Sequence, residues 1–288
     1  MIGRIILGKP ISDKIRATVK NQVDDFKKKY GFNPMITSII IGSNPEARLY
    51  LRLRDKACAA VGIESIHEEL AEDVTEKEVI NIIKKHNSDG RIHGILIQFP
   101  LPSGLSVENI MNSIEPGKDV EGFTPENLGN LMIGNEFLVP CTPLAVIKIL
   151  EHEDINLEGK HVVIVNHSTV VGKPLTALCL NRNATVSIAH VYTKNLVEIT
   201  QQADILITAA GVPGLITKDH IKDGAGVIDV SIVNTSDGVT GDILSSEVQQ
   251  KAAFITPVPG GVGPVTVACA LSNMMKTAEH VAGATEDE

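Results

Sequence analysis

A tyrosine and an arginine, Tyr50 and Arg54, stand four residues apart in a stretch whose pattern predicts a helix. Residues at this spacing lie on one face of a helix, so the phenol and the guanidinium can contact one ligand together. Arginine stays protonated under any realistic condition, so Arg54 can hold a charge but cannot cycle a proton. The same residues also fit a solvated basic face with Arg48, Arg52 and Lys56, and the sequence leaves both interpretations open.

A glutamine and a carboxylate occupy two further places where ligands are commonly bound. Gln98 lies near the end of an apolar run, residues 94–99, directly before a Pro-Leu-Pro segment. The carboxyl ends of strands in open α/β sheets favour ligand contacts, although a capped strand end explains Gln98 as well. Residues 118–122 read Lys-Asp-Val-Glu-Gly and bring the carboxylate of Glu121 to the boundary between two predicted domains. An ordinary surface turn is the alternative for this segment.

A polar turn at residues 166–171 joins an apolar run to a predicted helix that begins at Gly172. Free N–H groups and the positive end of a helix at such a turn suit the pyrophosphate of a dinucleotide. The usual G-x-G-x-x-G pattern is absent, since Asn166 stands where a first glycine belongs and Gly172 is the only glycine of the turn. Asn tolerates the left-handed backbone better than most residues, so this replacement is physically plausible. A plain strand–helix turn remains the alternative.

The segment after the next predicted strand leaves the choice of nucleotide open. Residues 189–194 read Ala-His-Val-Tyr-Thr-Lys. They contain no Asp or Glu to hold the ribose diol of NAD, and no Arg to hold the 2′-phosphate of NADP. Chemistry alone therefore does not distinguish the two nucleotides.

A loop at residues 256–266 contains three prolines and three glycines among eleven residues. Such a composition excludes an ordinary helix or inner strand and predicts a rigid loop with few side chains. Its glycines allow the backbone to approach a flat partner closely, although a tight connection before a helix explains the loop too. We expect Pro264 to be the first residue of the apolar helix that follows.

Composition narrows the class of protein. The chain has 288 residues, of which 43% are hydrophobic and 21% charged, and a formal net charge of -9. The acidic balance argues against a broad nucleic-acid footprint, and no run of about 18 apolar residues could span a membrane. The apolar part of residues 1–10 is too short for a signal peptide and predicts a first strand. Four scattered cysteines without C-x-x-C spacing predict buried, reduced thiols, no metal site and a cytoplasmic location.

The elements that position these residues alternate between strand and helix. In the first half we predict helices at 11–30 (with Ser12 as cap), 45–61 and 75–86 (with a Thr75–Glu78 capping box), and strands at 35–41, 63–67 and 94–99. In the second half we predict helices beginning at Thr142 and covering 172–181, and strands at 161–165, 185–189, 205–208, 226–230 and 254–255. The pattern predicts two α/β domains, the second a Rossmann-like, doubly wound parallel sheet. Residues 1–119 with the helix 265–288 would form one domain, and residues 120–264 the other.

Together these stretches resemble the bifunctional methylenetetrahydrofolate dehydrogenase/methenyltetrahydrofolate cyclohydrolase family, in that family's order and over nearly the whole chain. The Pro-Val-Pro-Gly-Gly-Val-Gly-Pro segment is the most specific match. The resemblance implies a cleft between two domains, with a reduced folate on the first, NADP on the second, and a cytoplasmic homodimer. It implies catalytic roles for Tyr50, Arg54, Gln98 and Glu121. It implies folate contacts from Tyr50, Gln98, Pro100, Leu101, Glu121, Pro259, Gly260 and Gly261, and nucleotide contacts from Thr142, Asn166, His167, Ser168, Gly172, Pro174, His190, Val191 and Ile232.

Two departures from the family pattern bear on catalysis. The family places a lysine four residues after the tyrosine and an aspartate near the pterin, whereas this chain has Arg54 and Glu121. Hydride transfer needs mainly the orientation of two rings, but hydrolysis of the methenyl product needs a proton to move. We therefore predict that dehydrogenase activity survives and that cyclohydrolase activity is weak or lost. Glu121 adds a methylene to the expected side chain, which shifts its carboxylate. The pair Arg54 and Glu121 could also suit a different reduced pterin carrier.

The nucleotide side departs as well. His167 replaces the family's common arginine and Val191 replaces a polar or basic residue, both near the expected 2′-phosphate. Ser168, His190, Lys194 and a protonated His167 can still supply donors, so the resemblance favours NADP and leaves NAD possible. Two other functions stay open, namely a different two-domain dehydrogenase of the shikimate type and a catalytically silent folate- or nucleotide-binding protein.

Overall fold

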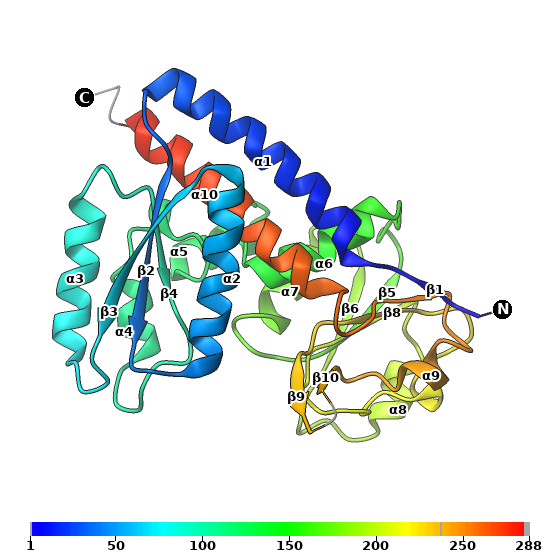
Figure 1. Cartoon of the computed structure of the whole chain (residues 1–288). Coiled ribbons are helices and arrows are strands. Elements are labelled where there is room, and N and C mark those ends of the chain that lie inside the picture. Colours follow the sequence, from blue (N-terminus) through cyan, green and yellow to red (C-terminus); the bar gives the residue numbers. More distant parts are fainter. Residues whose placement is uncertain (1, 237, 285–288) are drawn as a thin grey trace. The chain divides into compact units, whose positions relative to one another are not determined.

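Parallel strands alternate with helices in both parts of this computed structural model, which describes residues 2–236 and 238–284 (Figure 1). Residues 2–13, 131–135 and 140–269 form unit 1, and residues 14–130, 136–139 and 270–284 form unit 2. The predicted α/β class is confirmed in each unit.

Unit 2 is built on a three-stranded parallel sheet in the order β3-β2-β4. Because the chain crosses from β2 to β3 in one direction and from β3 to β4 in the other, α2 and α3 flank opposite sides of the sheet, as right-handed crossovers require (Figure 1). One face of the sheet forms an apolar core with α3 and α4. The elements are β2 (Met35–Ile41), β3 (Glu64–Leu70), β4 (Gly94–Ile97), α2 (Pro45–Val61), α3 (Glu76–Ser88), α4 (Val107–Asn112), η1 (Pro116–Lys118) and α5 (Pro125–Met132).

Predictions that depend on local signals are confirmed here. The strand β2 and the helix α2 have the predicted bounds. The capping box of α3 is present, since Thr75 Oγ1 accepts from the Glu78 N–H at 3.3 Å and Glu78 Oε2 accepts from the Thr75 N–H at 2.9 Å. Ser12 was predicted as a cap, and this is wrong. Helix α1 (Gly8–Tyr30) begins earlier, and the Ser12 hydroxyl donates to Lys9 O at 3.0 Å inside its first turns.

Unit 1 contains a six-stranded sheet in the order β1-β11-β8-β7-β5-β6, with every paired strand parallel. From β5 the chain first moves outward to β6 and then returns to the other side of β5 to form β7. This reversal is the switch point at which doubly wound sheets bind ligands at the carboxyl ends of their strands. The strands are β1 (Arg4–Ile5), β5 (His161–Val165), β6 (Thr185–Ala189), β7 (Ile205–Thr208), β8 (Gly226–Asp229) and β11 (Phe254–Ile255).

Short elements complete unit 1 around this sheet. A two-stranded antiparallel hairpin follows β8. Helix α6 begins at Cys141 after Pro140, one residue before the predicted start at Thr142, which lies inside its first turn. The elements are α6 (Cys141–His152), α7 (Gly172–Leu180), α8 (Leu196–Thr200), η2 (Lys218–His220), β9 (Val233–Thr235), β10 (Gly238–Thr240) and α9 (Ser245–Val248).

The chain start departs from the predicted domain limits. The expected first strand is short, and it pairs with β11 in unit 1, with Arg4 opposite Phe254 and Ile5 opposite Ile255. The Gly3 N–H also donates to Gln249 O at 2.7 Å. This pairing joins residues about 250 positions apart in sequence, so no local pattern could reveal which sheet receives the strand.

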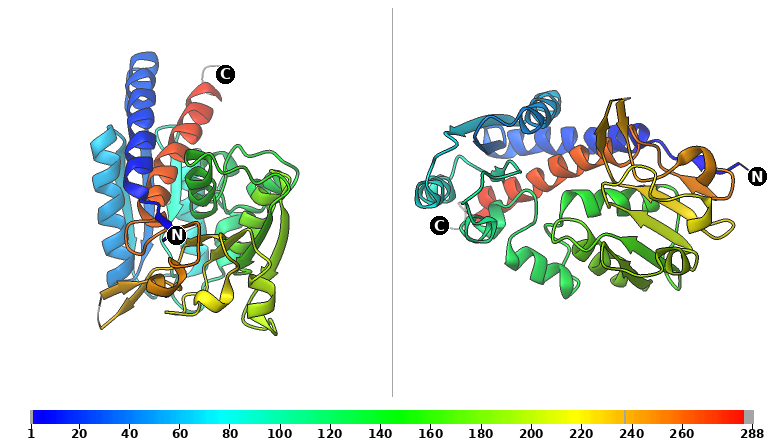
Figure 2. Two further views of the ribbon diagram at one scale, coloured as in Figure 1. Left: turned by 90° about the vertical axis from the view of Figure 1, so that its right-hand side faces the viewer. Right: turned by 90° about the horizontal axis from the view of Figure 1, so that it is seen from below.

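Helix α10 (Val262–Ala284) begins two residues before Pro264, which lies in its first turn. In unit 2, the later part of this helix runs beside α1 (Figure 2). Asn273 Nδ2 donates to Val120 O at 2.9 Å and to Val139 O at 2.8 Å, which fixes the helix to the turn that carries Glu121.

Residues 2–236 and 238–284, the part of the chain that the structure describes, contain neither a membrane-spanning helix nor a metal-binding cluster. No helix in this part is both long and apolar enough to cross a bilayer. No group of three His, Cys, Asp or Glu side chains there is arranged to hold a metal ion. All four cysteines are buried and free, as predicted. Burial raises the pKa of the Cys58 thiol to about 11 and that of Cys179 to about 12.

Candidate active site

A buried arginine organises the candidate site of unit 2. Arg54 is only 3% exposed, and its Nη2 donates to Gln98 Oε1 at 2.8 Å. Its guanidinium carbon lies 5.6 Å from the centroid of the Tyr50 ring, a cation–π distance. The structure therefore brings together three of the four predicted catalytic residues. The interpretation of Arg54 as part of a solvated face is wrong, although its neighbour Arg52 is exposed.

Local structure explains how these side chains meet. Helix α2 places Tyr50 and Arg54 one turn apart on one face. Strand β4 ends at Ile97, and the Gln98 N–H continues its ladder by donating to Ile39 O at 2.9 Å. The side chain of Gln98 uses both ends of its amide, because Nε2 donates to Phe99 O at 3.2 Å while Oε1 accepts from the guanidinium. The capped-strand alternative is thus partly correct, but the same amide also orients Arg54.

One donor of the guanidinium is unsatisfied. Within the described residues, Arg54 Nε is buried and has no hydrogen-bond partner. A buried donor without an acceptor costs about 1–3 kcal/mol. A bound ligand with an acceptor group would remove this cost. Arg54 therefore keeps one buried donor that an acceptor group of a ligand could bond.

The turn at residues 119–124 carries Glu121, the fourth predicted catalytic residue. Asp119 is buried and accepts from Gly122 N at 2.9 Å, Thr124 N at 2.7 Å and Asn127 Nδ2 at 3.1 Å. These bonds close the turn and hold Glu121 half-buried. The alternative of an ordinary surface turn is wrong, because a buried carboxylate fixes its shape.

The surroundings of Glu121 change its acidity. Burial raises the pKa of Glu121 to about 7, the nearby Arg54 charge opposes this rise, and the Asp119 charge adds to it. Glu121 is thus a carboxyl group that can hold or release a proton near neutral pH. The predicted catalytic set therefore contains one group poised for proton transfer, and it is the glutamate rather than the arginine.

Lys118 supports the same turn from the other side. Its Nζ donates to the carbonyl oxygens of His86, Asn87 and Asp89 at 2.8–3.0 Å, at the end of α3. Sequence reasoning missed these roles of Lys118 and Asp119. Only the folded chain brings these bonding partners together, so no local pattern revealed them.

The loop at residues 256–264 is anchored within unit 1. The Gly8 N–H donates to Gly260 O at 2.8 Å, and a Cβ on Gly261 would lie 2.5 Å from Pro257 O. Gly260 has φ +100, a backbone conformation that favours glycine, and the space beside it is open. Gly261 is therefore required by the loop's own packing, whereas Gly260 and its neighbour Pro259 are exposed. Folate contacts by Pro259, Gly260 and Gly261, and by Pro100 and Leu101 in unit 2, stay predictions.

A cavity of about 490 Å³ lies at the carboxyl ends of β5, β6 and β7, where the switch point predicts a ligand. Five of the nine predicted nucleotide residues line it, namely Asn166, His167, Ser168, His190 and Val191. The other lining residues are apolar or small, apart from one threonine: Val165, Thr193, Leu196, Ala210, Val212 and Leu215.

The remaining four predicted nucleotide residues lie outside that lining. Gly172 and Pro174 are buried in the first turn of α7, Thr142 is half-buried in α6, and Ile232 is 63% exposed. Nucleotide contacts by these four residues stay predictions.

Asn166 shapes the turn after β5 with its side chain. Its Oδ1 accepts from Ser168 N at 2.8 Å, Ser168 Oγ at 2.7 Å and Gly172 N at 3.0 Å, while its Nδ2 donates to Ala209 O at 2.6 Å. Among the described residues, Asn166 is not one of those with positive φ, so the left-handed explanation for its presence is wrong. A Cβ on Gly172 would lie 2.2 Å from Asn166 O, so close packing requires this glycine.

The loop after β7 is held by a buried carboxylate. Asp242 is fully buried and accepts from Thr208 Oγ1 at 2.6 Å, Ala210 N at 2.7 Å and Val212 N at 2.8 Å. Ala210 and Val212 line the cavity, so Asp242 sets the shape of one of its walls. Sequence reasoning gave Asp242 no role, because a buried polar network has no local periodicity.

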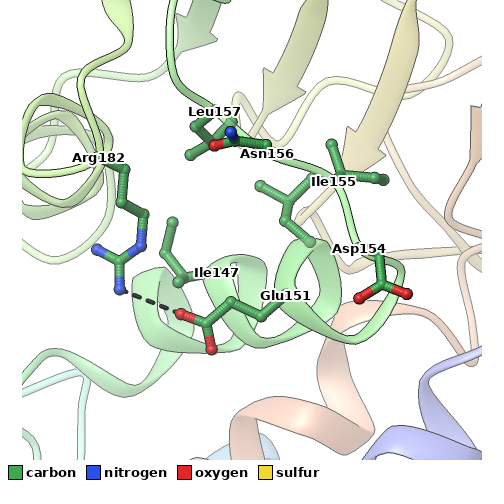
Figure 3. A pocket seen from close by; sticks show the side chains of 8 residues that line it. Ile147, Glu151, Asp154, Ile155, Asn156, Leu157 and Arg182 are labelled. Carbon is green, nitrogen blue, oxygen red and sulfur yellow. Dashed lines mark hydrogen bonds and ion pairs between the residues drawn. The ribbon is translucent and has the colours of Figure 1, made fainter.

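A second hollow in unit 1, of about 390 Å³, lies near the amino ends of β5 and β6 (Figure 3). It is lined by residues that precede β5 and β6 and by the end of α6, including an ion pair between Arg182 Nη2 and Glu151 Oε1 at 3.2 Å. Because ligands of doubly wound sheets bind at the carboxyl ends of the strands, this hollow is not part of the candidate site.

Comparison with known proteins gives a consistent result over both units. Residues 6–121 match the family model described as the catalytic domain of tetrahydrofolate dehydrogenase/cyclohydrolase, and residues 140–282 match its NAD(P)-binding domain. The bifunctional protein FolD of Methanococcoides burtonii is 45% identical over 279 residues, which cover 97% of this chain and 98% of that protein.

Solved structures give the same picture. The bifunctional enzyme FolD, a methylenetetrahydrofolate dehydrogenase/cyclohydrolase from Campylobacter jejuni, has a TM-score of 0.94 at 42% identity, covering 96% of this chain and 98% of that one. The corresponding FolD of Trypanosoma brucei, solved with NADP cofactor and an inhibitor, has a TM-score of 0.91 at 33% identity, with coverage of 96% and 98%.

Proposed function

Because the chain belongs to the tetrahydrofolate dehydrogenase/cyclohydrolase family, we propose that it oxidises 5,10-methylenetetrahydrofolate to 5,10-methenyltetrahydrofolate with NADP as hydride acceptor, and that it hydrolyses the product only weakly or not at all. One observation carries the proposal. A buried arginine, Arg54, is bonded to Gln98 beside Tyr50, where the family pattern has a lysine.

Oxidation makes modest demands on this set of side chains. When bound, the nicotinamide accepts a hydride that the pterin nitrogens push from the methylene carbon, so no protein group has to gain or lose a proton. Arg54 and Gln98 supply fixed donors and an amide that can orient the pterin, and the Tyr50 ring, 37% exposed, offers an aromatic face. These are positioning roles, and an arginine can perform them as well as a lysine.

Hydrolysis makes a different demand. A water molecule must attack the methenyl carbon and lose a proton to a nearby base. Arg54 cannot be that base, because a guanidinium stays protonated, and Gln98 does not titrate. Glu121 could accept a proton near neutral pH, which supports a low remaining rate rather than complete loss. With Glu121 as the one candidate base among these side chains, we propose that hydrolysis is slow.

The nucleotide cavity supports binding of NAD(P), and we extend the proposal to a preference for NADP. Among the residues that line this cavity there is no carboxylate to hold the ribose diol of NAD, whereas two histidine rings offer N–H donors to a phosphate. The chain is also proposed to form a homodimer in the cytoplasm, as the resemblance implies, with a reduced folate as its small-molecule partner. Light scattering of the purified protein would test the dimer.

Steady-state kinetics on purified protein tests the proposed function. Reduced nucleotide should form when methylenetetrahydrofolate and NADP are both present, more slowly with NAD, and not when the folate is left out. Absence of any nucleotide reduction would contradict the proposal and favour a silent binding protein. A higher kcat/KM with NAD would contradict the NADP preference alone.

A further inference from the structure

A buried aspartate ends strand β8 in unit 1. Asp229 is 2% exposed, and its two carboxylate oxygens accept backbone bonds from different segments. Its Oδ1 accepts from the Ser231 N–H at 3.0 Å, and its Oδ2 accepts from the Ile243 N–H at 2.9 Å. A Cβ on Gly241 would lie 2.2 Å from Oδ2, so the carboxylate fills the space beside that glycine. Neither step of the proposed reaction uses this side chain.

Asp229 is an anion at neutral pH. Burial raises its pKa to about 6, its backbone donors oppose this rise, and the Asp242 charge adds to it. Because this pKa lies below 7, most of the carboxyl groups are ionised at neutral pH and their hydrogen bonds are charge-assisted. Such bonds are roughly twice as strong as bonds between neutral groups. Asp229 therefore holds the backbone around it firmly.

In one direction the bonds of Asp229 lead to the nucleotide cavity. Ser231 Oγ accepts from the Gly211 N–H at 3.0 Å, so Ser231 connects Asp229 to the loop that follows β7. The residues on both sides of Gly211 line the cavity. Asp242, whose neighbour Ile243 donates to Asp229, bonds the N–H groups of these same two lining residues. Two routes therefore connect Asp229 with one wall of the cavity.

In the other direction the bonds lead to the loop at residues 256–264. The Asp229 N–H donates to Thr256 Oγ1 at 2.8 Å, and Thr256 is the first residue of this loop. Thr256 is 1% exposed, and its own N–H donates to Val227 O at 3.1 Å. A Cβ on Gly261 would lie 2.9 Å from Thr256 Cβ, so the threonine packs against the part of the loop that we expect to contact folate.

We propose that Asp229 is a positioning residue that couples the binding of folate to the binding of nucleotide. The path runs from Thr256 through Asp229 to Ser231 and the cavity wall, and all of it lies in unit 1. The proposal rests on the proposed function, because it takes the loop as a folate contact and the cavity as the nucleotide site. The first ligand to bind restricts the shared network, so the second ligand loses less conformational entropy and binds more tightly.

Calorimetry on the full-length protein measures this coupling. NADP is titrated at about pH 7.5, where Asp229 is ionised, with and without saturating tetrahydrofolate. Tetrahydrofolate lacks the methylene carbon and therefore cannot react. It should raise the affinity of the wild type for NADP about tenfold, and NADP should raise the affinity for tetrahydrofolate by the same factor, since coupling between two binding equilibria is reciprocal.

Three variants interrupt the path at different bonds. Thr256→Val removes the acceptor of the Asp229 N–H with little change of shape, and it should reduce the coupling to less than about twofold. Asp229→Asn should do the same, because an amide nitrogen then faces one of the two backbone donors. Ser231→Ala should reduce the coupling only to about threefold, because the route through Asp242 remains.

Thr200→Val is the matched control. Thr200 is as buried as Thr256, and its hydroxyl donates to Val197 O in α8, outside the path. This variant should keep the tenfold coupling. Hydrogen exchange adds a readout that needs no nucleotide, since tetrahydrofolate alone should slow exchange in residues 208–212 of the wild type but not of Thr256→Val.

The outcomes separate this proposal from the proposed function. Independent binding of the two ligands to the wild type would overturn the coupling. So would coupling that survives in Thr256→Val and Asp229→Asn, or coupling that is lost in Thr200→Val as well. If Asp229→Asn does not fold, Thr256→Val decides the matter by itself. A wild type that binds neither ligand would instead contradict the proposed function.

Discussion

Replacing Arg54 with lysine should restore hydrolysis of methenyltetrahydrofolate. A lysine in this buried position loses its charge far more readily than arginine, because desolvation lowers the pKa of an ammonium group. It could then accept the proton of the attacking water. General acid–base catalysis by a positioned side chain contributes about 10²- to 10⁴-fold. We expect a gain of about 100-fold, at the lower end of that range, since Glu121 is one methylene longer than the family's aspartate.

The fold should tolerate this change. Arg54→Lys removes the 2.8 Å bond from Nη2 to Gln98, a charge-assisted bond worth about 1.5–3 kcal/mol. It also removes the buried Nε that has no partner among the described residues, whose burial costs about 1–3 kcal/mol. The two terms nearly cancel, so we expect the free energy of unfolding to change by no more than about 1 kcal/mol.

The assay follows loss of the methenyl chromophore at neutral pH, with the spontaneous rate subtracted, beside oxidation of methylenetetrahydrofolate by the same preparation. Arg52→Lys is the matched control, because it makes the same chemical change on an exposed position of the same helix. It should alter neither activity. If folded Arg54→Lys hydrolyses no faster than the wild type, the assignment of the missing base to position 54 is refuted.

Three further predictions follow from the geometry. Between about pH 4.5 and 7 Glu121 keeps its proton in the native state, whereas the unfolded chain releases it, so the free energy of unfolding should fall as pH rises through this range. Glu121→Gln should remove about 1–3 kcal/mol of that loss. Denaturant unfolding at both ends of the range measures it. Asp242→Asn should raise the KM for nucleotide about tenfold with little effect on kcat, since it weakens the charge-assisted bonds to the cavity wall. Asp204→Asn is the control, because Asp204 accepts from the His161 N–H at the amino ends of the strands, away from the cavity. Equal KM effects in the two variants would contradict the role of Asp242 in shaping the cavity wall. Gly172→Ala should destabilise unit 1 by about 1–3 kcal/mol, because its Cβ would meet Asn166 O at 2.2 Å; unchanged thermal unfolding would contradict that account.

Local signals in the sequence predicted much of the fold. The apolar run of β2 and the helix α2 were predicted with their observed bounds, and the capping box at Thr75 was predicted with its reciprocal bonds. Each of these features depends on residues within a few positions of one another. The pairing of β1 with β11 could not be predicted in this way, because it joins residues about 250 positions apart in sequence.

In the candidate site, too, local features were predicted and contacts between distant residues were not. The spacing of Tyr50 and Arg54 predicted that they share a face. The strand end made Gln98 a candidate, and the resemblance placed it beside Arg54, 44 positions away. The buried state of Arg54 was not evident, since its neighbours on α2 suggested a solvated face. The roles of Asp119 and Asp242 were missed, because each accepts bonds from backbone groups that only the folded loops bring together.

One time course tests the central claim most directly. Purified wild-type protein is given methylenetetrahydrofolate and NADP, and reduced nucleotide, methenyltetrahydrofolate and 10-formyltetrahydrofolate are quantified together. The account predicts that methenyltetrahydrofolate accumulates in step with reduced nucleotide, while the formyl product appears late and near its spontaneous rate. Formation of 10-formyltetrahydrofolate as fast as reduced nucleotide, with no build-up of the methenyl intermediate, would contradict it.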